Sequence, residues 1–232
     1  MSTTLHTFDN GAALAEGLAD AVSAALATGI ATRGTASIAV SGGSTPKAFF
    51  QALARKDIAW DKVTVTLVDE RFVPPESDRS NHALVTANLL QGPAAKAHFL
   101  PLYHAAASAE DAAGLSSKAT AKIGTPFDVV VLGMGTDGHT ASFFPGGTQL
   151  SRAIDATTPR GVITMEAEGA GEPRLTFTFS SLHDARLLVL HIEGEGKKVV
   201  LAKAEGPGDE AEMPIRTMLR RAASPLQIYW AP

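Results

Sequence analysis

Asp137 and His139 are the side chains whose types and spacing best suit catalysis. They stand two residues apart in a glycine-rich segment that follows the apolar run Val129–Leu132. A neutral imidazole can take a proton from water and return it to a leaving group, and a nearby carboxylate can orient the ring. A lone histidine is more often structural, but the glycines of this turn let both side chains emerge into a crevice. We therefore predict that His139 is a general acid–base and that Asp137 supports it.

The same glycines also fit a dinucleotide-binding fingerprint, Gly133-x-Gly135-x-x-Gly138. Asp137 would then stand beside the pyrophosphate, and Pro145-Gly146-Gly147 interrupts the place where an unbroken helix must follow. A cofactor-dependent oxidoreductase is therefore the weaker alternative.

A second loop, Ser41-Gly42-Gly43-Ser44-Thr45-Pro46, follows the apolar run Ile38-Ala39-Val40. Its glycines permit close backbone approach to a ligand. We expect Thr45 to cap the next helix and Pro46 to take its first position, which leaves free amides at the positive end of the helix dipole. Such a loop can bind a phosphate. A helix-capping turn without a ligand needs the same residue types, so both interpretations stay open.

The tripeptide Asp69-Glu70-Arg71 follows the apolar run Val63–Val68. Arg71 could bind a phosphate with its planar fork while an adjacent carboxylate accepts sugar hydroxyls. An exposed, ion-paired turn is the alternative. Ser80-Asn81 is expected to cap the following helix and to take no part in chemistry.

Two further cations are candidates for binding an anion. Lys197 follows Gly194-Glu195-Gly196 at the start of a helix, and Arg174 heads an alternating segment. Each could equally be a solvated surface residue.

Composition excludes cysteine-based sites, and residue spacing argues against a zinc site and a serine hydrolase. The chain of 232 residues has no cysteine, its seven histidines show no zinc-binding spacing, and it has no Gly-x-Ser-x-Gly elbow. Its formal charge of −4 argues against nucleic-acid binding and against binding to an anionic membrane. The N-terminus does not resemble a leader and the apolar runs are short, so we expect a cytoplasmic protein without a membrane segment.

Short apolar runs alternate along the chain with alanine-rich stretches of helical spacing. Runs without polar alternation are typical of strands that are buried on both faces. We expect strands at Ser37–Val40, Val63–Val68, Phe127–Leu132 and Leu187–Ile192, helices at Ala12–Ala27, Pro46–Arg55, Asn81–Leu90, Ala109–Ile123 and Lys197–Ala204, and an antiparallel hairpin within Gly161–Phe179.

These elements predict an α/β fold with an open, mostly parallel, doubly wound (Rossmann-like) sheet flanked by helices and a small antiparallel addition. One domain over residues 1–232 is the simplest organisation. Loops at the carboxyl ends of such strands meet in one crevice, so the three loops are expected to form one site.

Taken together, the motifs resemble the 6-phosphogluconolactonase family. The resemblance rests on Ser41–Pro46, on Asp69-Glu70-Arg71 with Ser80-Asn81, and on Leu132-Gly-Met-Gly-Thr-Asp-Gly-His-Thr-Ala-Ser-Phe-Phe-Pro145. It continues through Arg174–Thr178, Gly194-x-x-Lys197 and Met213–Trp230, and so spans nearly the whole chain. Thr136 departs from the pattern, which commonly has proline there.

Glucosamine-6-phosphate deaminases share the first loop and an Asp-Gly-His turn. Their patterns read Asp-Glu-Tyr at the second loop and Gly-His-Ile-Ala-Phe-Asn-Glu-Pro at the third, whereas Arg71 and Phe144 stand here at the places of the tyrosine and the glutamate. The resemblance therefore favours the lactonases. A deaminase- or isomerase-type enzyme is the alternative, and a non-catalytic sugar-phosphate-binding regulator, which has no need of His139, is a further one.

The resemblance implies hydrolysis of 6-phospho-D-glucono-1,5-lactone to 6-phosphogluconate, in the oxidative pentose phosphate pathway and without a metal or organic cofactor. On that basis we expect three catalytic residues, His139, Asp137 and Asp69. His139 would act as the base, and Asp137 would orient the imidazole or a sugar hydroxyl. Asp69 is expected to accept a hydroxyl hydrogen bond and not to act as a base, although the deaminases use the equivalent carboxylate in proton transfer. The implied substrate-binding residues are Ser41, Gly42, Gly43, Ser44, Thr45, Arg71, Arg174 and Lys197.

Which of the three cations faces the negative charge that develops at C1 is left open. The expected partner is a small sugar-phosphate lactone, with no nucleic acid and no membrane, and the expected assembly is a monomer or a weak homo-oligomer.

Overall fold

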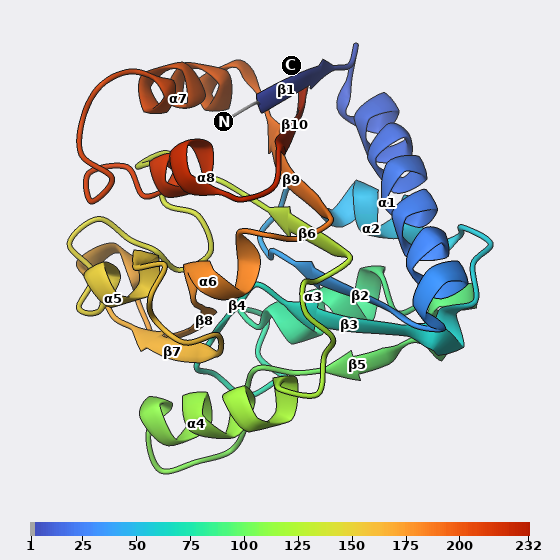
Figure 1. Cartoon of the computed structure of the whole chain (residues 1–232), viewed down its shortest axis with the longest axis horizontal. Helices are drawn as coiled ribbons and strands as arrows, with labels where there is room; N and C mark the ends of the chain where they lie inside the picture. The colour runs from blue at the N-terminus through green and yellow to red at the C-terminus, as the bar shows by residue number, and fades with distance from the viewer. Residues whose placement is uncertain (1–2) are drawn as a thin grey trace.

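A seven-stranded parallel sheet forms the centre of the fold (Figure 1). In this computed structural model, which describes residues 3–232, the strands lie in the order β1-β10-β9-β6-β2-β3-β5. Their bounds are β1 Thr3–Thr7, β2 Ala36–Val40, β3 Val63–Leu67, β5 His98–Leu100, β6 Val129–Leu132, β9 Leu187–Glu193 and β10 Leu226–Ala231. All neighbouring strands in this sheet pair in parallel. The predicted α/β class with a mostly parallel sheet is confirmed.

The four runs that were predicted as buried strands lie side by side, as β9, β6, β2 and β3. Every residue of β2 and β6 is buried. These strands have no polar face because helices cover both sides of the sheet.

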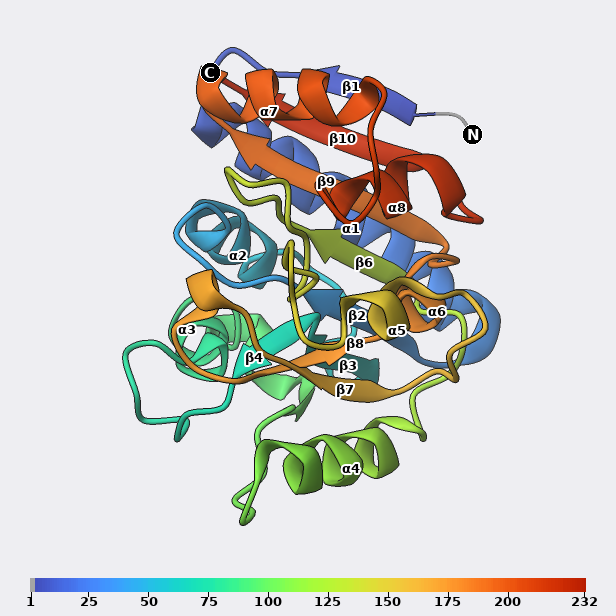
Figure 2. The ribbon, with the colours of Figure 1, turned by 90° about the vertical axis from the view of Figure 1, so that its left-hand side faces the viewer.

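Helices cover the two faces of the sheet, α1 and α2 on one and α7 and α8 on the other (Figures 1 and 2). The bounds are α1 Gly11–Arg33, α2 Lys47–Ala54, α3 Asn81–Asn88, α4 Ala109–Thr120, α5 Leu150–Ile154, α6 Phe179–Leu182, α7 Glu195–Glu205 and α8 Ile215–Arg221, with short 3₁₀ turns at Trp60–Lys62, Gly92–Lys96 and Glu168–Ala170. All five predicted helices are confirmed, with shifted ends.

By length and composition alone, α1 could cross a membrane. The expectation that no apolar segment approaches that length is therefore wrong for this helix. Leu14, Leu18, Val22 and Leu26 recur every fourth residue and are buried, and the helix packs on β2 and β10. A single apolar stripe turned toward a sheet is typical of a core helix.

A second sheet has three antiparallel strands in the order β4-β8-β7. Strands β7 (Val162–Met165) and β8 (Arg174–Phe177) confirm the predicted hairpin. Strand β4 (Asp69–Arg71) was not predicted, and the expectation of a loop or exposed turn at these residues is wrong. Its pairing partner, β8, lies far along the chain, so no local signal marks it.

Val68 is the point at which the chain passes from one sheet to the other. Its N–H donates to the Val40 carbonyl of β2 at 2.8 Å, and its own carbonyl accepts the Phe177 N–H of β8 at 3.1 Å. This transfer places Asp69 and Arg71 next to the carboxyl end of β2.

Candidate active site

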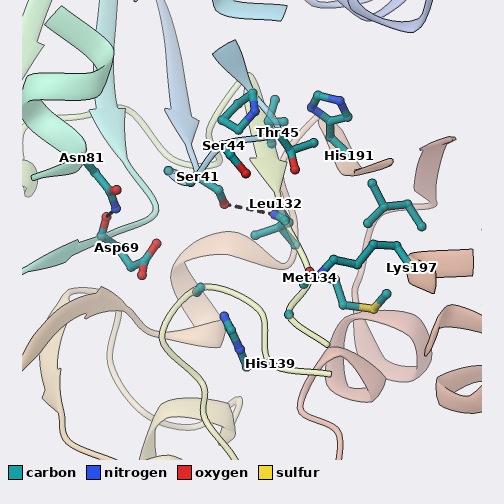
Figure 3. A pocket seen from close by; sticks show the side chains of 18 of the residues that line it. Ser41, Ser44, Thr45, Asp69, Asn81, Leu132, Met134, His139, His191 and Lys197 are labelled. Atoms are coloured by element: carbon teal, nitrogen blue, oxygen red, sulfur yellow. Dashed lines mark hydrogen bonds between the residues drawn. The ribbon is translucent and has the colours of Figure 1, made fainter. Parts of the chain in front are cut away.

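A cavity of about 300 Å³ opens at the carboxyl ends of β2, β6 and β9 (Figure 3). Its position agrees with the rule that ligands of open α/β sheets bind at this edge. The candidate residues that line it are Ser41, Gly42, Gly43, Ser44, Thr45, Asp69, Arg71, His139, Arg174 and Lys197. Asp137 does not line the cavity itself but contacts His139.

The loop after β2 forms one wall and is bonded to the loop after β6. Ser41 N–H donates to the Val131 carbonyl at 3.0 Å, and Gly133 N–H donates to Ser41 Oγ at 3.1 Å. Gly43 has a φ of +97° and nothing within 4 Å of the place where a Cβ would stand, so it borders open space. Its conformation favours glycine.

The expectation that Thr45 caps α2 is wrong. The cap position belongs to Pro46, whose dihedrals of −77° and −2° are already helical, and no side chain bonds the first amides of the helix. Because the proline turns the chain into the helix, Thr45 is not needed as a cap and its side chain lies at the cavity (Figure 3).

Asp137 and His139 form a close pair in the turn after β6. Asp137 Oδ1 lies 2.7 Å from His139 Nδ1 and also accepts the His139 backbone N–H at 3.1 Å. Gly135 backs onto both side chains, because a Cβ there would stand 2.2 Å from His139 Nδ1 and 2.5 Å from Asp137 Oδ1. Gly138 supplies the φ of +81° that turns the chain between them.

The hydrogen bond from His139 is the main reason that the pKa of Asp137 falls to about 2, although burial opposes the shift. Asp137 is therefore ionised at neutral pH and can only accept hydrogen bonds. In the neutral form of His139, a carboxylate at this place holds the proton on Nδ1, and Nε2 carries the free lone pair. This is the tautomer that a general base requires.

Asp69 and Arg71 reach the cavity from β4. The Asp69 side chain is buried, and its backbone carbonyl accepts a hydrogen bond from Asn81 Nδ2 at 2.9 Å. Arg71 Nη1 donates to the backbone carbonyl of Arg79, which holds the guanidinium at the cavity rim. The alternation of the strand turns Glu70, between them, to the other side.

Lys197 lies across the cavity from Asp69 (Figure 3). Its Nζ donates to the Met134 carbonyl at 2.6 Å, so it also holds the glycine-rich turn after β6. Burial lowers the pKa of Lys197, while the charge of Asp137 opposes the shift.

Arg174, on β8, is 9% exposed. Its Nη2 donates to the Ala170 carbonyl at 2.7 Å, and within residues 3–232 its buried Nε has no hydrogen-bond partner. Burial lowers the pKa of the guanidinium, and the charge of Asp69 opposes the shift. The group lies 5.4 Å from the Phe144 ring centre, and that ring lies 4.5 Å from the His139 ring.

Comparisons with known proteins identify the family of the chain. A family model described as glucosamine-6-phosphate isomerases/6-phosphogluconolactonase matches residues 9–230. The chain belongs to this family. It is 74% identical to a 6-phosphogluconolactonase of Rhizobium meliloti (strain 1021) over the full length of both chains, and 51% identical to one of Mesorhizobium japonicum over 98% of this chain and 94% of that one.

A crystal structure of a 6-phosphogluconolactonase from Shewanella baltica OS155 superposes with a TM-score of 0.95 at 38% identity, covering 100% of this chain and 98% of that one. Likeness at this level makes the chain an enzyme of the 6-phosphogluconolactonase branch of the family.

In this 6-phosphogluconolactonase relative, three cavity residues were missed by sequence reasoning. Asn81, expected only as part of a helix cap, bonds the Asp69 backbone, and a Cβ on Gly42 would stand 1.8 Å from its Oδ1. His191 and Glu193 end β9 and pair at 3.0 Å between Nε2 and Oε1. The Ser-Asn pair at the start of a helix could have pointed to Asn81 as a cavity residue. No local sequence pattern marks His191 or Glu193.

Glu70 does not line the cavity but bonds the backbone around it. It is fully buried and accepts backbone N–H groups of Arg71, Asn81 and His82 at 2.7, 2.8 and 2.8 Å. Burial raises its pKa, and these bonds oppose the shift. Over residues 3–232 no three histidine, aspartate or glutamate side chains gather as a metal site would require.

Proposed function

We propose that this chain hydrolyses 6-phospho-D-glucono-1,5-lactone to 6-phosphogluconate. The observation that carries the proposal is the His139–Asp137 pair at the edge of a cation-lined cavity. Identity of 74% with a relative that bears the 6-phosphogluconolactonase name supports this substrate over other sugar phosphates.

In the proposed reaction, His139 Nε2 removes a proton from water as the water oxygen attacks the C1 carbonyl. A tetrahedral intermediate with a negatively charged oxygen results. The bond between C1 and the ring oxygen then breaks, and the imidazolium returns its proton to that oxygen, which becomes the C5 hydroxyl. The new carboxylic acid loses its proton to solvent. Asp137 stabilises the imidazolium through Nδ1.

The phosphate would bind at the glycine-rich wall. Backbone amides of Gly42, Gly43 and Ser44 can donate to its oxygens, with the Thr45 hydroxyl beside them. Arg71 and Lys197 reach the cavity from its two sides and would offset the dianion. Binding this remote group fixes the lactone for attack at C1.

Arg174 would face the oxygen that becomes negative at C1. Three observations support this assignment: the guanidinium is buried, it retains donor capacity, and it packs on the same Phe144 ring as His139. A cation held in a site of low polarity stabilises developing charge more strongly than one in water.

The test is the consumption of freshly generated 6-phosphogluconolactone, measured against its spontaneous hydrolysis. The wild type should accelerate the reaction, and His139→Ala should lower kcat by about 10²–10⁴-fold. His98→Ala removes an exposed histidine of β5 and should leave the rate unchanged. An unchanged rate in His139→Ala would remove the base from the mechanism, and a wild type no faster than background would overturn the function.

A deaminase is the alternative, and a second assay separates it from a lactonase. Phe144 fills the place of the deaminase glutamate and packs its ring on His139, so no second carboxylate assists ring opening there. Ammonia release from glucosamine 6-phosphate would identify a deaminase. Binding of sugar phosphate without turnover would identify a regulator.

A further inference from the structure

The carboxylate of Asp69 has one oxygen committed inside the protein. Its Oδ2 accepts a hydrogen bond from Ser142 Oγ at 2.5 Å. No other protein donor to the carboxylate is found within residues 3–232, and the side chain lines the cavity. Oδ2 is thus bonded within the protein, while Oδ1 can accept a hydrogen bond from a ligand in the cavity.

Ser142 touches Asp69 from outside the cavity. It is fully buried and does not belong to the cavity wall, so it cannot act on a substrate itself. Its single hydroxyl proton goes to Asp69, and its backbone N–H donates to Thr176 Oγ1 at 3.3 Å. Thr176 is the residue of β8 that pairs with Asp69 in the small sheet.

The residue before Ser142 has a strained backbone conformation. Ala141 has a φ of +50°, the only positive value of a residue other than glycine within residues 3–232. Such a conformation is unfavourable for an alanine and persists where the surroundings impose it. Thr140 Oγ1 secures the preceding turn by donating to the Gly133 carbonyl at 2.8 Å.

The segment from His139 to Ser142 therefore serves two purposes. At one end it displays the imidazole, and three residues later it contacts the carboxylate on β4. The base and the residue that bonds the Asp69 carboxylate are therefore only three residues apart in the chain.

We propose that Ser142 is a positioning residue, which holds the Asp69 carboxylate in one orientation so that its free oxygen accepts a ring hydroxyl of the substrate. The inference rests on the proposed function and extends it to the choice of substrate, since a carboxylate fixed in this way selects a ligand with a hydroxyl at that place. A site built to bond a hydroxyl discriminates strongly against analogues that lack it, because its own polar group is then left unpaired.

The test compares kcat and KM for 6-phosphogluconolactone in the wild type, Ser142→Ala, Asp69→Ala and the double variant. Ser142→Ala should raise KM by about three- to tenfold, with kcat changed less than about twofold, because binding of a non-reacting hydroxyl is equal in ground and transition states. In the Asp69→Ala background, the same change should leave KM as it is, since no carboxylate remains to be positioned.

Two further variants separate positioning from folding. Ser142→Cys keeps the shape but is a weaker donor, and it should lie between serine and alanine in KM. Ser116→Ala removes another fully buried serine hydroxyl, which bonds the Leu102 carbonyl, and should change the melting temperature without changing KM.

The outcomes are distinct. An unchanged KM in Ser142→Ala, or an equal rise of KM with and without Asp69, would assign Ser142 to structure alone and overturn the inference while leaving the lactonase function intact. A wild type that does not exceed spontaneous hydrolysis would instead remove the proposed function, and the positioning role with it.

Discussion

At the scale of single residues, the pairing of Asp137 with His139 depends on a missing side chain. Gly135 leaves the space in which the two lie, since any Cβ there would collide with both. The hydrogen bond from His139 lowers the pKa of Asp137 to about 2, and the carboxylate is charged at neutral pH. The sequence pattern Gly-x-Asp-Gly-His therefore specifies a tautomer and not only a turn.

The two arginines of the small sheet should separate in a kinetic experiment. Arg71→Ala should mainly raise KM, because a phosphate contact is equal in ground and transition states. Arg174→Lys should mainly lower kcat, by about 10²–10³-fold, because it removes the planar donor from the developing oxyanion. Steady-state kinetics with both variants is the measurement.

Arg152→Ala serves as the control and should resemble the wild type, because this arginine is exposed and its side chain hydrogen-bonds only Gln149 within residues 3–232. A fall in kcat alone for Arg71→Ala would exchange the two assignments.

At the scale of elements, Glu70 joins β4 to the start of α3. Its carboxylate accepts the first two amides of the helix, which have no partner within it, and also the Ser80 hydroxyl at 3.0 Å. Negative charge is favourable at this end of a helix. This junction places the Asn81 side chain next to Gly42 and within hydrogen-bond distance of the Asp69 carbonyl. Glu70, which is buried and does not line the cavity, therefore helps to hold the cavity wall in place.

Glu70→Ala should lower the free energy of unfolding by about 3 kcal/mol, because one buried and two part-buried backbone N–H groups lose their acceptor. Chemical denaturation followed by circular dichroism measures the loss. Glu168→Ala, at an exposed glutamate, should change it by less than about 0.5 kcal/mol. Equal stability of the two variants would contradict the role given to Glu70.

At the scale of the whole molecule, the last strand of the chain pairs with the first. Strand β10, the last element, lies between β9 and β1, the first (Figure 1). The cavity lies on the other side of β10, at the ends of β9, β6 and β2. The interior strand is therefore essential to the sheet, whereas the edge strand is remote from the site.

Two truncations should behave differently for this reason. Removal of residues 226–232 deletes an interior strand and should abolish soluble, folded protein. Removal of residues 1–7 deletes an edge strand whose residues are mostly exposed, and should lower the melting temperature while activity persists. Soluble yield, circular dichroism and lactonase activity of both forms are the measurements. Activity in the first form would show that β10 is dispensable.

The central strands and the long helices were predictable from the sequence, because continuous apolar runs and helical spacing reflect burial along one element. The sequence also determined that Ser41–Thr45 and His139 share an edge, since loops after parallel strands must meet. Local chemistry misled at Thr45, whose side chain was expected to cap α2 but makes no cap hydrogen bond there. It was silent on β1, β5 and β10, whose short or terminal runs carry weak patterns.

Tertiary structure alone decided the rest. Asp69 became part of a strand through pairing with Thr176, and Ser142 came to bond Asp69 from a segment far along the chain. The Asn81 side chain can line the cavity because Gly42 has no Cβ that would collide with it. Such contacts join residues distant in sequence, and their energies depend on geometry that no local pattern encodes. The chemical roles open to the residues could therefore be predicted from the sequence, whereas their hydrogen-bond and pairing partners depend on the fold.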